Sequence, residues 1–335
     1  PTLGPNDALP ALNDQNPNSR SLNSAIFGAV AMIYLFSSGF KVKEQQEFPC
    51  NNSSAIVAEG QIMFETTSNK SQLGAAWSMG EVIYHATVRH VRQTHSNALF
   101  SLLINMLQTL MLVIVFYLMF LLLGRGGGKV RGDLLLFIMT GIFLFMTHVK
   151  AMTAVAGSAG PTSPLMQHAP MNTFVSIASS ALSTLYIQVL SVSVVLGGYE
   201  MWTGNVHIAD PKGVMAMFLL AWFSGVCVGM VFLALKPWAP QFSTIATQIY
   251  SRANMIASGK MFVANSLPST ILVMFSWNPL FHIIDQARGY TFVNYNPHYT
   301  SATYPLVVSL VLLFIGMMGE HYTRKHASIS WGAKN

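Results

Sequence analysis

The sequence predicts an all-α integral membrane protein, because apolar residues dominate it, charges are scarce, and long apolar stretches recur along it. Of its 335 residues, 52% are hydrophobic and only 9% are charged, whereas soluble domains carry about 25% charged residues. A soluble globule of this length cannot bury so much apolar surface behind so little charge. The bilayer is therefore expected to be the solvent of this chain.

Six segments are predicted to cross the membrane as helices. Five of them carry almost no charged residues. The remaining one, Ser243–Phe262, is unusually polar, with Gln248, Arg252, Asn254 and Lys260 along its length. The six predicted spans are 98–123, 134–156, 171–196, 213–235, 243–262 and 301–318.

Two details of these spans follow from their polar and small residues. His148 and Lys150 lie near the end of the second span, where long polar side chains are expected to reach toward a membrane surface. The third span is predicted to close at Gly197-Gly198-Tyr199-Glu200.

The first part of the chain has a different character. Residues 1–23 form a polar arm rich in Pro and Asn, and 41–75 form a polar insert. Between them, Ala25–Phe40 would make a helix of about 24 Å, shorter than the ~30 Å hydrocarbon layer. An interfacial or protein-covered helix is therefore favoured over a full span, and residues 1–76 are treated as an N-terminal extension.

Residues 77–95 predict an amphipathic helix on the membrane surface. Apolar side chains alternate there with charged ones, among them Arg89 and Arg92, and the segment leads directly into the first span. An ordinary solvated helix face is the alternative. Residues 96–335 then form the transmembrane domain.

The net charge of +6 does not predict nucleic-acid binding, because no run of five to eight basic residues occurs. In membrane proteins Lys and Arg instead mark the cytoplasmic side. The basic helix at 77–95 and the basic tail at 321–326 place both ends there. The turn with Arg125, Lys129 and Arg131 would then face outward, against this rule.

No motif in the sequence predicts enzymatic chemistry, a metal or a cofactor. Cys50 lies in a polar segment and Cys227 in an apolar one, and neither has metal-binding spacing. Gly-Gly-Gly-Lys at 126–129 lacks the spacing of a phosphate-binding loop. Any ATP hydrolysis would therefore belong to a partner chain.

The dipeptide Asn278-Pro279 predicts a break inside an apolar segment. Proline removes a backbone donor and disfavours helix at the preceding residue, and irregular backbone at membrane depth must be covered by protein or line a cavity. A re-entrant hairpin over 268–290 is therefore expected. Arg252 should face the bundle interior or an aqueous path, or else pair structurally with Glu200, Asp285 or a carbonyl.

These marks in the last third resemble a known family. Their order is Arg252, Ser258-Gly259, Phe262, Leu267-Pro268, Trp277-Asn278-Pro279-Leu280, His282, Ile284 and Arg288. This order is similar to the end of ABC-2 type export permeases, closest to those for capsular polysaccharide and O-antigen. The resemblance covers roughly residues 77–335. Lys260 departs from the family pattern, and residues 1–76 have no counterpart in it.

The resemblance implies a six-span ABC-2 type bundle in the bacterial inner membrane, with an N-terminal interfacial helix and a re-entrant periplasmic hairpin before the last span. It also implies a homodimer of permeases among membrane lipids, driven by a separate ATPase subunit. Residues implied to couple to the ATPase are Arg89, Arg92, Pro161, Pro164 and His168. Residues implied for the path and gate are Arg252, Ser258, Gly259, Trp277, Asn278, Pro279, Phe281, His282, Arg288 and Tyr295.

Two functions stay open at this point. The first is export of a polysaccharide or lipid-linked glycan, which the aromatic residues between Trp277 and Tyr304 would suit. An interfacial aromatic belt also explains those residues, and it is favoured over a sugar path. The second is a structural subunit of a larger membrane assembly, such as a bioenergetic complex, docked through residues 1–76. An integral membrane enzyme is a third, weaker reading.

Overall fold

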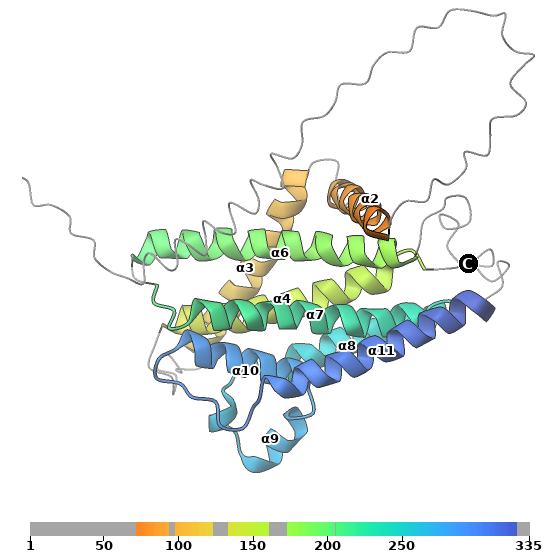
Figure 1. The fold of residues 1–335 in the computed structure, drawn as a ribbon. Coiled ribbons are helices and arrows are strands. Elements are labelled where there is room, and N and C mark those ends of the chain that lie inside the picture. Colours follow the sequence, from red (N-terminus) through yellow and green to blue (C-terminus); the bar gives the residue numbers. More distant parts are fainter. Residues whose placement is uncertain (1–71, 94–97, 123–132, 161–172, 205, 327–335) are drawn as a thin grey trace, which may run out of the picture.

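The computed structural model describes residues 72–93, 98–122, 133–160, 173–204 and 206–326. In this part of the chain every regular element is a helix (Figure 1). In chain order the elements are α2 (Gln72–Gln93), α3 (Ala98–Leu122), α4 (Leu134–Gly157), α6 (Thr173–Thr203), α7 (Pro211–Leu235), α8 (Pro240–Ala257), η1 (Ala264–Ser266), α9 (Ser269–Phe275), α10 (Pro279–Thr291) and α11 (Thr303–His326).

Five of these helices, α3, α4, α6, α7 and α11, are long and apolar enough to cross a membrane. They coincide with five of the six predicted spans, so the prediction of an all-helical, multi-pass membrane protein is confirmed for the described residues. The sixth predicted span, 243–262, corresponds to the more polar helix α8. A sixth crossing and the re-entrant hairpin stay predictions.

Helix α4 lies at the centre of the bundle. It is buried almost without interruption from Leu136 to His148, and it packs against α3, α6, α7 and α10. The long helices α6, α4, α7 and α11 run roughly side by side (Figure 1). Helix α2 packs against α6 and buries Ala86 and Thr87.

The predicted helix over 77–95 is confirmed as α2, which begins earlier, at Gln72. Its position on a membrane surface stays a prediction. The predicted end of the third span was wrong, because α6 continues through Gly197 and Gly198 to Thr203. Glycine costs a helix only about 1 kcal/mol relative to alanine. Helix α6 ends instead at Gly204, whose positive φ of 73° suits a C-terminal cap.

Several predictions lie outside the described residues. These are the N-terminal arm, the apolar stretch Ala25–Phe40, most of the polar insert, and the basic turn between α3 and α4.

A close helix contact in the core joins α4 to α7 at Gly225. A Cβ atom at this position would lie 2.3 Å from the backbone oxygen of His148, which is closer than non-bonded atoms approach. Missing side chains let two helix backbones come together, as small residues do in membrane bundles. Gly225 therefore sets the distance at which the two central helices pack.

We predict that Gly225→Ala destabilises the bundle, because the new methyl group must push the α4 backbone away. Overpacking of this kind costs about 1–3 kcal/mol. The matched control is Gly198→Ala in α6, where nothing lies within 4 Å of an added Cβ. Thermal unfolding of the purified protein should show a lower midpoint for Gly225→Ala alone. Equal midpoints would contradict this packing role.

Candidate functional site

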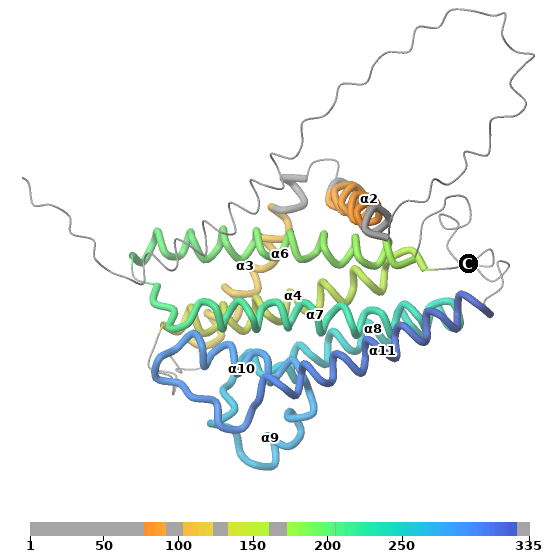
Figure 2. Tube along the Cα trace, in the orientation of Figure 1, coloured from red at the N-terminus to blue at the C-terminus, as the bar shows by residue number. Residues whose placement is uncertain are grey.

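Two shorter helices, α8 and α10, together line the length of α7. Ser243 of α8 donates to the carbonyl of Phe232 (2.8 Å), near the end of α7. At the other end, the backbone N–H groups of Ala209 and Asp210 donate to the carbonyls of Thr291 and Tyr290 (3.1 and 2.8 Å). Figure 2 shows α8 and α10 following one another along the bundle, with α9 projecting away from it.

The start of α10 is held against the last turns of α8 by two asparagines. Asn278 accepts the backbone N–H of Leu280 through Oδ1 (3.0 Å) and so caps α10. Its Nδ2 donates to Oδ1 of buried Asn254 on α8 (2.7 Å). Pro279 occupies the first turn, where it needs no backbone donor. The break predicted at Asn278-Pro279 is thus confirmed as the start of a new helix.

Arg288 of α10 is fully buried, at 0% exposure, and holds the irregular chain that follows α8. Its Nη1 donates to the carbonyls of Gly259 (3.0 Å) and Phe262 (2.7 Å), and its Nη2 donates to that of Lys260 (2.6 Å). The guanidinium also lies over the ring of Phe137, 3.9 Å from its centroid. One side chain therefore pairs the carbonyls of Lys260 and Phe262, and it adds a second donor to the Gly259 carbonyl, which also accepts the backbone N–H of Phe262 (3.2 Å).

Asp285 lies one turn before Arg288 and accepts hydrogen bonds. Its Oδ1 accepts the Tyr295 hydroxyl (2.6 Å) and the backbone N–H of Ala264 (3.2 Å). Its Oδ2 accepts the Thr300 hydroxyl (2.8 Å). Both carboxylate oxygens therefore bind groups that pack around α10. The structural pair considered between Arg252 and Asp285 was wrong.

His282 ties the chain before α10 to the chain before α11. Its Nε2 donates to the Ser276 carbonyl (2.9 Å) and its Nδ1 accepts the backbone N–H of Ser301 (3.2 Å). This pattern needs the neutral ring protonated on Nε2. Tyr304 packs on the ring at 4.7 Å between centroids, and its hydroxyl donates to the carbonyl of exposed Trp277 (3.0 Å).

Gly259 is required at the end of α8. Its φ is +71°, and a Cβ there would lie 2.4 Å from the ring of buried Phe281. Ser258 beside it is fully buried and caps α8 through its backbone N–H. The structure therefore brings together Ser258, Gly259, Asn278, Pro279, Phe281, His282, Arg288 and Tyr295, and we call this cluster the junction site.

Lys260 follows the junction site directly and has an unusual environment; the sequence marked it as a polar residue of the predicted span 243–262 and as a departure from the family pattern. It is 3% exposed, and within the described part of the chain its Nζ has no hydrogen-bond partner. The ammonium instead lies over the rings of Phe145 (3.9 Å) and Phe116 (4.8 Å). Aromatic faces attract a cation, so Lys260 links the junction site to α3 and α4.

A second polar cluster was not foreseen. His148 is fully buried, so the expectation that it reaches a membrane surface was wrong. Its Nδ1 lies 2.9 Å from Oγ of Ser224, and its Nε2 lies 3.2 Å from the Tyr250 hydroxyl. Since Ser224 donates to the Ala221 carbonyl (2.9 Å), Nδ1 donates and Nε2 accepts. His148 lies beyond the midpoint of α4 and inside the bundle, where its polar neighbours come from α7 and α8.

Arg252 lies on the outer face of α8, exposed at the surface of this chain rather than inside its bundle. It belongs to a row of exposed polar residues at helical spacing, beside an exposed apolar row on the same helix. The polar row, which we call the polar stripe, consists of Gln241, Thr244, Gln248 and Arg252; the apolar row consists of Phe242, Ile245, Ile249 and Ile256. Exposing the polar stripe to the hydrocarbon of a bilayer would cost free energy.

Of the residues expected to couple to an ATPase, Arg89 alone has a side chain in the described part of the chain. Arg89 is exposed on α2, whereas Pro161, Pro164, His168 and the side chain of Arg92 lie outside the described part. Their role stays a prediction.

The sequence matches no protein-family model and no curated protein. Within the described residues, no group of three or more His, Cys, Asp or Glu side chains is placed to hold a metal ion. The geometry of the junction site and the polar stripe therefore carries the functional argument.

We predict that Arg288→Gln loosens the chain at 258–268. Glutamine cannot reach three carbonyls, and each one left unpaired costs about 1–3 kcal/mol. Hydrogen exchange should show faster exchange of peptides over 258–268 than in the parent protein. The exposed Arg252→Gln is the control and should leave these peptides unchanged. Identical exchange in Arg288→Gln would contradict the role assigned to Arg288.

We also predict that Lys260→Met leaves thermal stability unchanged or raises it. Methionine has a similar unbranched shape, and its substitution removes an amine that burial deprives of water and hydrogen bonds. Lys260→Ala should lower stability by about 2–5 kcal/mol, because it leaves a cavity. Thermal unfolding in one detergent compares the two variants. A large loss in Lys260→Met would show that attraction to the two rings outweighs the burial cost.

Proposed function

We propose that this chain is the membrane permease subunit of an exporter, which moves a polysaccharide or lipid-linked glycan across a bacterial inner membrane. A separate ATPase subunit would hydrolyse ATP, and two copies of the chain would enclose the path. The chain itself would catalyse no reaction. The proposal follows the resemblance to ABC-2 type permeases.

The observation that carries the proposal is the polar stripe on α8. It lies on the outside of a bundle in which the spans α3 and α11 expose largely apolar faces. A polar row among membrane spans needs water or a polar partner. A path between two copies, lined by α8 of each, would supply both. In such a path Arg252, which is exposed on α8, would line the aqueous route.

The contacts between helices support a route for mechanical work. Helix α2 packs on α6, α6 on α4, and α4 on α10. Motion received by α2 from an ATPase would reach the junction site through this series of packed helices. At that site, Arg288 and Asp285 hold the irregular chain on α10. Exposed Trp277 and Tyr299 would then contact a sugar leaving the path.

The alternative is a structural subunit of a larger membrane complex. Such a subunit needs the same packed bundle but no aqueous path. Helix α8 would then use the polar stripe to bind a neighbouring chain. The two functions differ in whether an ATPase accompanies the chain and in whether Arg252 matters for transport.

We predict that Arg252→Leu abolishes glycan export while the protein stays in the membrane at its normal level, because the path loses its cation. Ile249→Leu on the neighbouring apolar row is the matched control and should export normally. Surface glycan is measured in native cells in which each variant replaces the parent chain. Unchanged export in Arg252→Leu would make Arg252 structural.

Purification of the complex in native lipids tests the partner. A stoichiometric ATPase with a phosphate-binding loop is expected, identified by mass spectrometry. Unrelated membrane subunits without an ATPase, found repeatedly, would overturn the exporter proposal in favour of the structural one.

A further inference from the structure

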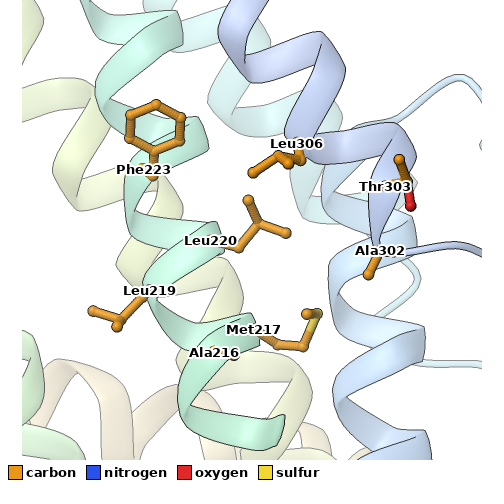
Figure 3. Close-up of a pocket in the computed structure, with 8 residues that line it drawn as sticks. All are labelled: Ala216, Met217, Leu219, Leu220, Phe223, Ala302, Thr303 and Leu306. Atoms are coloured by element: carbon orange, nitrogen blue, oxygen red, sulfur yellow. The ribbon is translucent and has the colours of Figure 1, made fainter.

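An apolar groove of about 470 Å³ opens on the side of the bundle between α7 and the start of α11 (Figure 3). Its volume falls within the ~300–1,000 Å³ typical of small-molecule sites. Thr303 supplies the only polar side chain of its lining. The lining residues are Ala216, Met217, Leu219, Leu220, Phe223, Ala302, Thr303 and Leu306.

Helices α7 and α11 approach closely in the second half of each helix. There a Cβ on Gly316 would lie 2.8 Å from Cβ of Met230, and one on Gly319 would lie 2.9 Å from Cβ of Ala234. These two glycines let the helix backbones approach. Toward Thr303 no such pair joins the helices, and the space between them is left to the groove.

The surroundings of the groove decide what can fill it. Both helices are candidate membrane spans, and the rim residues Leu219 and Leu306 are 43% and 44% exposed. In a bilayer the groove therefore opens toward hydrocarbon. An apolar groove facing hydrocarbon excludes polar ligands and accepts an acyl chain.

A cation lies in line with the groove. Lys212 is one helical turn before Ala216 on the same face of α7, about 6 Å along the axis, and its side chain is exposed. It belongs to the first turn of a span, where lysine reaches the headgroup layer. Asp210 beside it caps the helix by accepting the backbone N–H of Lys212 (3.1 Å).

We propose that this groove binds one acyl chain of an anionic phospholipid, whose phosphate contacts Lys212. The lipid fills the space that the splayed ends of α7 and α11 leave open. It thereby holds the start of α11 in place beside the junction site. This site is independent of the proposed export function.

The test uses the full chain in nanodiscs that contain a trace of phosphatidylglycerol with a photoreactive group midway along one acyl chain. After illumination, mass spectrometry maps the labelled peptides. Labelling is expected to concentrate at 216–223 and 302–306. The same acyl chain on phosphatidylcholine should label roughly fivefold less, since one lysine near the headgroup favours an anionic lipid to that extent.

Three variants sharpen the result. Leu306→Trp fills the groove and should remove most labelling, whereas Val307→Trp, on the adjacent exposed position, should not. Lys212→Gln leaves the groove intact, so it should keep the labelling and lose the preference for phosphatidylglycerol. It also keeps the proposal testable if Leu306→Trp fails to fold.

Either of two outcomes overturns the proposal. The first is labelling spread evenly over the exposed face of α11 and insensitive to Leu306→Trp, which means annular lipid only. The second is no labelling of the groove, with Leu306→Trp changing the oligomeric state, which means that a second copy of this chain fills it.

Discussion

The structure depends on one constraint: the backbone between α8 and α9 leaves its helix inside a bundle of apolar spans, where its carbonyls find no water. Arg288 meets this demand with three hydrogen bonds and lies fully buried to do so. Other features follow from the same demand. Gly259 supplies the positive φ that turns the chain, and Asp285 takes up the N–H of Ala264 that the turn leaves behind. A buried irregular segment is stable here because Asp285 and Arg288, one turn apart on α10, pair its N–H and carbonyl groups.

The chain that follows α8 buries Lys260, and this burial costs free energy. Its ammonium has aromatic faces but no acceptor among the described residues, so its burial is offset only in part. An arrangement optimised for stability alone would place an apolar residue there. Strained or poorly satisfied groups tend to persist where function needs them, which is consistent with the junction site being more than a packing solution.

Much of the fold could be predicted from the sequence, because long apolar segments indicate which helices lie in a bilayer. Five spans and the break at Asn278-Pro279 follow from apolar length and from the missing proline donor. The partners inside the bundle could not be predicted, because they join residues far apart in the chain, such as His148 with Tyr250. Asp285 and Arg288 offered one usable signal: two opposite charges spaced by three in an apolar helix must share a buried face. Gly197 misled the prediction of a helix end because a glycine signals a stop only where φ turns positive, as at Gly204.

The way α10 is anchored indicates which element is free to rearrange. Its start is bonded through Asn278 to Asn254, and its end is bonded to the chain before α7 at Ala209 and Asp210. Its inner face packs into the central core with α4 and α7. Helix α8, by contrast, buries only Ser243 and Asn254. Elements with little buried surface open at the lowest free energy. If a path opens beside the polar stripe, α8 therefore moves against a fixed unit of α4, α7 and α10, with Asn254 and Asn278 at its hinge.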